Sequence, residues 1–328
     1  MKVSVIGSGA WGTALAALLV KNGHDTALRF LSKPHADVID GSRVSRYLPD
    51  VVLPEQLQLI DSLDGIEDDE FIVFACPSVR LRENAELLRG KVCRDAIIVS
   101  VAKGIESSTG NRLSAVLSDV LGNLERIAVL SGPSHAEEVA RGIPTGCVAA
   151  AWSNITARAV QDAFMSSDFR VYTSGDIIGV EISGAIKNIM AIAVGISDGL
   201  GYGDNTKAML MTRGLSEMAR LGEKLGGRRE TFSGLAGVGD LIVTCTSGHS
   251  RNRRAGLNIG EGMSVDDAMA SVGAVVEGYY AAESVFKLAN SCGVETPITN
   301  ALYDILYNKA DPRVATVSLM GRDKKSEI

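Results

Sequence analysis

The 328-residue sequence lacks the closely spaced cysteines and histidines that build disulfide frameworks and metal sites. The cysteines lie far apart without a CxxC motif, which is typical of reduced, structural thiols in a reducing compartment. The histidines show no ligand spacing, so the sequence predicts no metal site. The residues concerned are Cys76, Cys93, Cys147, Cys245 and Cys292, and His24, His35, His135 and His249.

An excess of positive charge is also missing, because the formal net charge at pH 7 is −6. Nucleic-acid backbones recruit basic faces, so a general nucleic-acid surface is not expected. A small basic pocket for one phosphate group remains compatible with this balance. The hydrophobic share of 46% and the charged share of 22% are ordinary for a soluble globular protein.

The sequence lacks recognisable membrane-directed segments. A strand pattern follows Met1 at once, without the charged, apolar and cleavage regions of a signal peptide. No apolar run is expected to approach the roughly 20 residues of a spanning helix. We therefore expect a cytoplasmic protein that is not inserted in a membrane.

Short apolar runs alternate with helical patterns in the first half of the chain. This rhythm predicts βαβ units and a Rossmann-type, doubly wound parallel sheet whose strands are covered on both faces. The predicted strands lie at residues 2–7, 25–30, 69–77, 95–104 and 126–134, and the first helix lies at 8–23.

The sequence pattern changes after about residue 175. Long helical patterns rich in Ala, Met, Leu and Gly begin there, and no convincing strand follows. A chain of this length is expected to form two domains. We predict a dinucleotide-binding domain over residues 1–177 and an all-α C-terminal domain over residues 178–328. The last eight residues are expected to form a solvated, frayed tail.

The first predicted strand runs directly into "GSGAWG", a G-x-G-x-x-G motif that opens the first helix. Gly7 permits the tight turn, Gly9 lets the backbone approach a pyrophosphate, and Gly12 lets helix and strand pack closely. The helix N-terminus offers free N–H groups to the anion. This context predicts a dinucleotide site rather than a purely structural turn.

The end of the second predicted strand carries no Asp or Glu for the ribose of NAD. Arg29 and Lys33 are present there instead. Either they face the 2′-phosphate of NADP, or they are solvated surface charges. We favour NADP(H), with use of both NAD and NADP as the alternative.

Lys187 lies in "VEISGAIKNIMAIAVG", a segment whose other residues suit a buried helix. Glu181 is six residues away and does not share its face, so the ammonium group needs a partner from another segment or a ligand. A lysine that snorkels to the surface is the alternative. Burial would lower the pKa of Lys187 toward the working pH, which suits proton exchange with a carbonyl oxygen.

Three further segments carry polar groups at predicted ligand-facing positions. Lys103 ends a parallel strand, where doubly wound sheets open on a ligand crevice, and small polar residues over 130–139 end the next strand. The loop at 234–256 contains Asp240, Thr244 and the arginine-rich stretch "SRNRR". Arginine forks match phosphate oxygens, although a solvated helix start would also explain this run of charge.

Six segments together resemble NAD(P)-dependent glycerol-3-phosphate dehydrogenases of the bacterial biosynthetic kind. They are "GSGAWGTALA", "SVAKGIE", "LSGPSHAEEVA", "GVEISGAIKNIMAIAVGISDGLGYGDNTKA", "GLAGVGDLIVTC" and "SRNRR". The resemblance covers nearly the whole chain in order. It implies reduction of dihydroxyacetone phosphate to sn-glycerol 3-phosphate with NAD(P)H, for phospholipid synthesis. It also implies a homodimer, the state that is common among relatives.

The resemblance also implies residue roles. Lys187 is similar to the family's general acid/base, Lys103 to a lysine that contacts cofactor and substrate, and Asp240 to a residue that hydrogen-bonds the lysine or substrate. Implied substrate contacts are Gly132, Ser134, Asn188, Thr244, Ser250, Arg251 and Asn252. Implied cofactor contacts are Ala10, Trp11, Ala136, Arg251 and Glu277. The stretch "LRFLSKP" departs from the family pattern, which leaves the 2′-phosphate contact open.

Two other functions fit parts of this pattern. One is a dehydrogenase of the same architecture that acts on a 3-hydroxy acid or a phosphorylated sugar acid. The other is a sensor that binds NAD(P) without turnover, although a sensor has no need for Lys187, Asp240 and Arg251 together.

Overall fold

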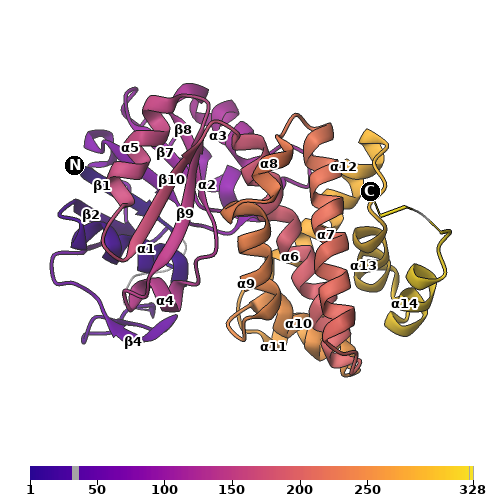
Figure 1. Ribbon diagram of the computed structural model, residues 1–328. Helices are drawn as coiled ribbons and strands as arrows, with labels where there is room; N and C mark the ends of the chain where they lie inside the picture. The colour runs from indigo at the N-terminus through magenta and orange to yellow at the C-terminus, as the bar shows by residue number, and fades with distance from the viewer. Residues whose placement is uncertain (32–36, 325, 328) are drawn as a thin grey trace.

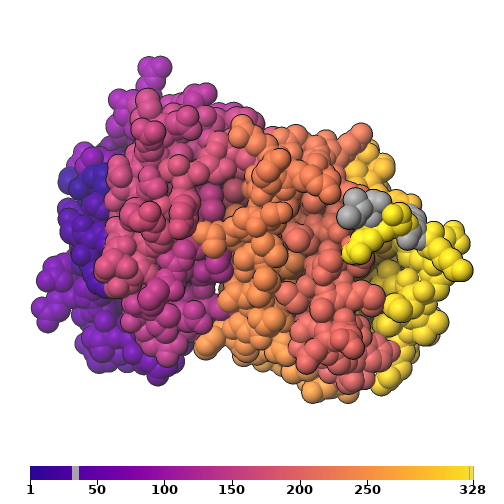
Figure 2. All heavy atoms as spheres, viewed as in Figure 1, coloured from indigo at the N-terminus to yellow at the C-terminus, as the bar shows by residue number. Residues whose placement is uncertain are grey.

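The computed structural model describes residues 1–31, 37–324 and 326–327. Two halves lie side by side: an α/β half built from the first part of the chain and a helical half built from the second (Figure 1). The space-filling view shows the halves in contact along a seam, with a narrow gap between them (Figure 2).

Eight strands form the main sheet, in the order β10-β9-β8-β7-β6-β1-β2-β5. All neighbouring pairs are parallel except β8 and β9, which are antiparallel. The predicted parallel, doubly wound core is therefore confirmed, with one antiparallel connection added. The strands are β1 (Lys2–Ile6), β2 (Asp25–Arg29), β5 (Gln58–Ile60), β6 (Phe71–Phe74), β7 (Ile97–Ser100), β8 (Ile127–Ser131), β9 (Thr145–Ala151) and β10 (Phe169–Ser174).

Helices cover both faces of this sheet, which explains why its central strands are continuous apolar runs. One apolar cluster packs α1 and α5 against the sheet, and another packs α2 and α3 against the opposite face. The helices are α1 (Ala10–Lys21), α2 (Leu81–Leu87), α3 (Leu113–Leu121), α4 (Ala136–Ala140) and α5 (Asn154–Phe164).

Five strands agree with the predicted ones, and five were not predicted. Two of the latter, β3 (Val44–Ser45) and β4 (Leu48–Val52), pair only with each other in a small antiparallel sheet. The others are β5, β9 and β10, at the two edges of the main sheet. The sheet is therefore wider than the five-strand core that the sequence indicates.

After Ser174 the described residues form helices and no strand, so the expected change to an all-helical second half is confirmed. The helices are α6 (Ile177–Gly199), α7 (Asp204–Lys224), α8 (Arg229–Phe232), α9 (Asp240–Thr246), α10 (Arg251–Gly260), α11 (Val265–Ser271), α12 (Glu277–Cys292), α13 (Pro297–Asn308) and α14 (Pro312–Met320).

Helix α6 is the centre of the helical half. The expectation that no apolar run reaches spanning length is wrong for this helix, which is long and apolar enough to cross a membrane. In this structure 89% of its most apolar stretch is buried inside the protein. Its apolar composition is explained here by contacts with α7, α9, α10 and α12 on different sides.

Glycines bring α6 and α10 into close backbone contact. A Cβ at Gly195 would lie 2.1 Å from the carbonyl oxygen of Arg253, and a Cβ at Gly256 would lie 2.1 Å from that of Ile192. No side chain fits at these positions without displacing the other helix. The contact fixes Lys187 and Asn188 on α6 relative to the first turn of α10.

Candidate active site

The predicted site residues lie where the carboxyl ends of the central strands meet the helical half. The strand order reverses between β1 and β6, since β1 lies between β2 and β6 in the sheet. Doubly wound sheets bind ligands at such a switch point. Figure 1 shows the helical half, including α6 and α9, facing the α/β half across this boundary.

The glycine loop fits a dinucleotide pyrophosphate. Gly7 has φ +114°, and a Cβ at Gly12 would lie 2.0 Å from the carbonyl oxygen of Gly7, so both positions need glycine. Beside Gly9, by contrast, a Cβ would meet nothing within 4 Å. Gly9 precedes α1 without a side-chain cap, and no acidic residue lies in the first turn. The free N–H groups of this turn can therefore donate hydrogen bonds to an anion.

Asp240 joins the two lysines that the sequence singles out. Its Oδ2 atom lies 2.7 Å from Lys103 Nζ of the α/β half, and its Oδ1 atom accepts a hydrogen bond from Lys187 Nζ on α6. Lys187 also donates to Thr244 Oγ1 at 2.9 Å. Lys187 is buried, so the snorkelling alternative is wrong and the expected partner from another segment is found.

A π-helical turn places Asp240 at this point. It covers Leu235–Gly239 and runs directly into α9, whose first residue is Asp240. A Cβ at Gly237 would lie 2.1 Å from the carbonyl oxygen of Phe232, so the turn depends on that glycine. Such π-turns are rare and are frequently found at functional sites. The glycine-rich stretch "GLAGVG" is thus a device for positioning one carboxylate.

One carboxylate, Asp240, is paired with two ammonium groups, and the pKa values of the two lysines shift in opposite directions. Burial, together with the nearby Lys103 cation, lowers the pKa of Lys187 to about 7 against the opposing charge of Asp240. Burial also acts on Lys103, but Asp240 outweighs it and raises the pKa of that lysine. The two lysines hold the pKa of Asp240 below its ordinary value despite its burial. Lys187 is therefore the group poised to exchange a proton near neutral pH.

The end of β8 contributes backbone groups beside Lys103. Lys103 Nζ donates to the carbonyl oxygen of Gly132 at 3.3 Å, and Ser134 Oγ donates to the same oxygen at 3.0 Å. Gly132 has φ +157°, and a Cβ there would lie 2.9 Å from Cys147 Cα. The structure thus brings Lys103, Gly132 and Ser134 together, as expected.

Asparagines link α6 to the start of α10 and α12. Asn252 Nδ2 donates to Asn188 Oδ1 at 2.9 Å, and the backbone N–H of Gly278 donates to Asn252 Oδ1 at 2.8 Å. Ser250 caps α10 by accepting from the N–H of Arg253. The predicted anion-binding segment is therefore a helix N-terminus held against Asn188 and, through it, the lysine helix.

The arginines of "SRNRR" have different environments. Arg253 is paired with Asp198, with Nε at 3.0 Å and Nη2 at 2.5 Å from Oδ2. Arg251 is exposed and makes no hydrogen bond or ion pair with the described residues, while its charge acts on the Glu277 carboxyl group. Arg251 is thus free to meet a ligand, whereas Arg253 is committed to Asp198.

The remaining predicted cofactor residues fall into two groups. Ala10, Trp11 and Ala136 belong to one apolar cluster beside the glycine loop. Glu277, the first residue of α12, accepts hydrogen bonds from Ser78 N at 3.1 Å and Ser78 Oγ at 2.5 Å, next to the carboxyl end of β6. Burial raises the pKa of Glu277. Both groups border the same edge of the sheet.

Arg29 is not where a ribose 2′-phosphate contact would require it, and this expectation is wrong. Its side chain is 3% exposed and turns back along the sheet, where Nε donates to Ser4 Oγ at 2.6 Å. Nη1 donates to the carbonyl oxygens of Ser62 and Asp64, and Nη2 lies 3.8 Å from Asp69 Oδ2. Lys33, the other candidate for this contact, lies outside the described residues.

Sequence reasoning missed a buried link between the halves. Glu181 of α6 accepts from the N–H of Ser114 at 2.7 Å and from Ser114 Oγ at 2.6 Å, at the start of α3. Arg112 Nη1 also donates to Glu181, at 2.5 Å. The only sequence signal was an acidic residue in a buried helix, and that signal does not identify the partners.

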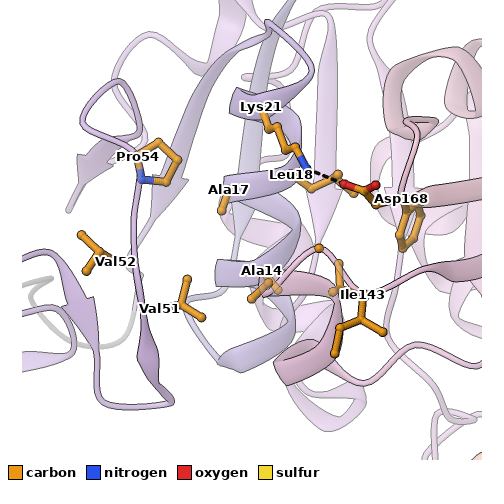
Figure 3. A pocket seen from close by; sticks show the side chains of 13 residues that line it. Ala14, Ala17, Leu18, Lys21, Val51, Val52, Pro54, Ile143 and Asp168 are labelled. Atoms are coloured by element: carbon orange, nitrogen blue, oxygen red, sulfur yellow. Dashed lines mark hydrogen bonds and ion pairs between the residues drawn. The ribbon is translucent and has the colours of Figure 1, made fainter.

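A surface pocket of about 200 Å³ lies apart from these residues, between α1, β4 and the α4–β9 connection (Figure 3). Its walls are mostly apolar, and the Lys21–Asp168 ion pair of 2.6 Å borders it. None of the predicted catalytic or binding residues lines it. The chemistry-bearing residues therefore define the candidate site, and this pocket does not.

Comparisons with known proteins match both halves. Residues 2–157 match the family model of the NAD-dependent glycerol-3-phosphate dehydrogenase N-terminus, and residues 176–317 match that of its C-terminus. The chain is 50% identical to the Glycerol-3-phosphate dehydrogenase [NAD(P)+] of Clostridium botulinum (strain Eklund 17B / Type B), over 100% of this chain and 99% of that protein. It is also 50% identical to the protein of that name from Clostridium acetobutylicum, over 99% and 98% of the two chains.

A solved structure agrees with these relatives. The crystal structure of glycerol-3-phosphate dehydrogenase from Coxiella burnetii superposes with a TM-score of 0.94 at 38% identity, over 98% of this chain and 99% of that one. Fold, site geometry and sequence therefore lead to one conclusion. The chain belongs to the NAD-dependent glycerol-3-phosphate dehydrogenase family.

Proposed function

We propose that this chain interconverts dihydroxyacetone phosphate and sn-glycerol 3-phosphate by hydride transfer with NAD(P)H, and so supplies glycerophospholipid synthesis. The observation that carries the proposal is the Lys103–Asp240–Lys187 cluster, buried beside a dinucleotide loop. The printed names of the full-length relatives support the substrate and the cofactor.

Lys187 is the general acid/base in this proposal. In the reduction it donates a proton to the oxygen that was the ketone of the substrate, and in the oxidation it removes that proton. The cluster carries two ammonium groups and one carboxylate, so it offers net positive charge to the developing alkoxide. Charge that is already oriented in a water-poor site stabilises such a transition state strongly. Asp240 positions both lysines, and Thr244 fixes Lys187 from the other side.

The first turn of α10 holds the substrate phosphate in this proposal. Ser250, Arg251 and Asn252 provide a hydroxyl group, a guanidinium fork and an amide at a helix N-terminus. Gly132, Ser134 and Asn188 line the remainder of the substrate site. Binding energy at the phosphate can then be used to orient the reacting carbon.

The cofactor site is formed by both halves. NAD(P)H supplies the hydride when it is bound. The open space beside Gly9 and the uncapped start of α1 fit its pyrophosphate. The residues that we propose to hold it are Gly7, Gly9, Ala10, Trp11, Gly12, Lys103, Ala136, Arg251 and Glu277. Arg29 does not support a preference for NADP, because its side chain is buried. Lys33 is the one remaining residue that we propose for the 2′-phosphate of NADP.

Three organisational proposals accompany this function. The domain boundary lies near residue 177, where α6 begins. The protein acts in the cytoplasm. It is a homodimer, and exposed apolar side chains on one helix offer a surface for self-association: Val314, Val317 and Met320 of α14.

Initial rates with dihydroxyacetone phosphate, measured separately with NADH and NADPH, test the function. We expect oxidation of one or both cofactors, and no comparable rate with a 3-oxo acid or an oxidised phosphorylated sugar acid. Turnover of one of those alternatives in place of dihydroxyacetone phosphate would assign the chain to another dehydrogenase reaction. Cofactor binding without turnover of any of these substrates would indicate a sensor.

A further inference from the structure

Two histidines meet across the boundary between the halves. His135 precedes α4 in the α/β half, and His249 lies in the turn between α9 and α10 in the helical half. Their ring centroids are 5.7 Å apart, with the ring planes at 52°. They are the only two histidines in the described chain whose rings contact each other.

Both histidines adjoin proposed substrate contacts along the chain. His135 follows Ser134, and His249 precedes Ser250, the cap of the helix that is proposed to hold the phosphate. A phosphate bound at the first turn of α10 would therefore lie near this ring pair. Imidazolium groups are suitable partners for a phosphate dianion, because they carry charge and donate two N–H bonds.

His135 has unused hydrogen-bonding capacity. Its Nε2 atom is buried and makes no hydrogen bond with the described residues. Burial lowers the pKa of His135, and the Lys187 cation lowers it further, so the ring is held neutral near neutral pH. Glu137 and Glu138 of α4 act in the opposite direction, and His249 adds to the lowering. A phosphate dianion would oppose the effect of Lys187 and favour the charged ring.

We propose that His135 and His249 form a two-sided clasp for the substrate phosphate and that substrate binding draws a proton onto this pair. The proposal rests on the proposed function, because it assigns the ligand at the same site. The clasp is a binding and positioning device, distinct from proton transfer by Lys187.

The sign of the pH effect follows from this geometry. A ligand that raises the pKa of a histidine binds more tightly when the histidine is protonated, and this advantage disappears as the pH rises. The KM for dihydroxyacetone phosphate should therefore increase from about pH 6 to about pH 8, around the ordinary histidine pKa. Ionisation of the substrate phosphate contributes equally in every variant and cancels in the comparison.

The test compares wild type with the double variant His135→Gln/His249→Gln. Loss of charge-assisted hydrogen bonds should raise the KM about tenfold at about pH 6 and much less at about pH 8, with kcat changed less than about twofold. His249→Lys keeps a permanent charge, so its KM should vary less with pH than that of wild type. His24→Asn is the matched control, because the His24 ring contacts the carbonyl oxygen of Ala163, away from the proposed substrate site, and its replacement should leave the profile unchanged.

Calorimetry with sn-glycerol 3-phosphate provides an independent readout. In two buffers of different ionisation enthalpy, wild type should take up protons on binding near pH 7, and the double variant should take up fewer. Equal uptake, or an equal KM ratio between the two pH values, would overturn the clasp while the proposed function stands. Failure of wild type to reduce dihydroxyacetone phosphate would instead overturn the proposed function itself.

Discussion

Neighbouring arginines at the start of α10 have separable roles. Arg251 is exposed beside Glu277 and makes no bond with the described residues, and Arg254 is exposed on the same helix. Arg253 is committed to Asp198. Because only Arg251 is proposed to contact the ligands, these side chains offer a substitution and its control within one helix.

Arg251→Ala should raise the KM for dihydroxyacetone phosphate by about 10-fold to 100-fold, the value of one or two charge-assisted hydrogen bonds. The kcat should fall much less. Arg254→Ala should leave both constants within about twofold of wild type, since surface substitutions usually have small effects. Steady-state kinetics on the two variants decide the point, and an unchanged KM in Arg251→Ala would remove its role as phosphate contact.

The role of Arg29 could not be predicted from its residue type and its position at the end of a strand. The sequence placed an arginine at the end of the second strand, but the direction of its side chain depends on Ser4, Ser62 and Asp64, which come together only in the fold. Lys187 was easier to interpret, since a buried ammonium group must have a partner wherever the chain folds. The identity of that partner, Asp240, came from family resemblance.

Arg29→Gln should act on stability and leave cofactor choice unchanged. It removes the cation from a buried carboxylate, Asp69, which costs about 3 kcal/mol in typical proteins. Thermal unfolding should show a lower Tm, while the ratio of kcat/KM for NADPH and NADH stays within about twofold. A tenfold loss of NADPH preference at unchanged Tm would return Arg29 to the cofactor site.

At the scale of elements, the glycines between α6 and α10 determine the site geometry. Gly195→Ala would place a methyl group 2.1 Å from the carbonyl oxygen of Arg253. Overpacking of this kind costs about 1–3 kcal/mol and should move Lys187 relative to Ser250. We expect a lower Tm together with a lower kcat/KM for dihydroxyacetone phosphate.

Gly41→Ala is the control for this substitution, because a Cβ there meets nothing within 4 Å and the φ of Gly41 is not in the left-handed region. It should leave Tm and kcat/KM close to wild type. If Gly195→Ala behaves like Gly41→Ala, the close packing of α6 and α10 does not position the site.

The elements differed in how well their sequences revealed them. Four of the five central strands are rich in β-branched and apolar residues, and the structure confirms all five, including the more polar β2. Strand β9, "TGCVAAA", is rich in alanine and small residues, so its sequence does not favour a strand. Edge strands β5 and β10 are only partly buried and lack a continuous apolar run. The site was predictable where a motif or a buried charge constrained it, whereas the Glu181–Ser114 link required the folded structure.

At the scale of the whole molecule, neither half contains the proposed active site alone. The α/β half supplies Lys103 and the glycine loop, and the helical half supplies Lys187 and Asp240. Glu181 and Glu277 hold the halves together through Ser114 and Ser78. The environment that lowers the pKa of Lys187, the proposed proton-transfer group, therefore forms only when both halves are assembled.

The proposed homodimer belongs to this scale as well. Sedimentation of the full chain should give a species of twice the 34.6 kDa chain mass. Val317→Glu, on the exposed face of α14, should shift that species toward the monomer, because a charge is disfavoured in an apolar contact. A dimer that is unaffected by this substitution would place the interface elsewhere, and a monomeric wild type would end the proposal.

The central claim is that Lys187, buried against Asp240, exchanges the proton with the substrate oxygen. The decisive measurement is kcat against pH in both directions, for wild type and Lys187→Ala. Because the pKa of Lys187 is lowered to about 7, wild-type kcat should fall above that pH for ketone reduction and rise through it for alcohol oxidation. Lys187→Ala should lose at least about 100-fold in kcat and the pH step, with cofactor affinity near normal. A variant that kept more than about a tenth of wild-type kcat, with the same pH step, would contradict the account.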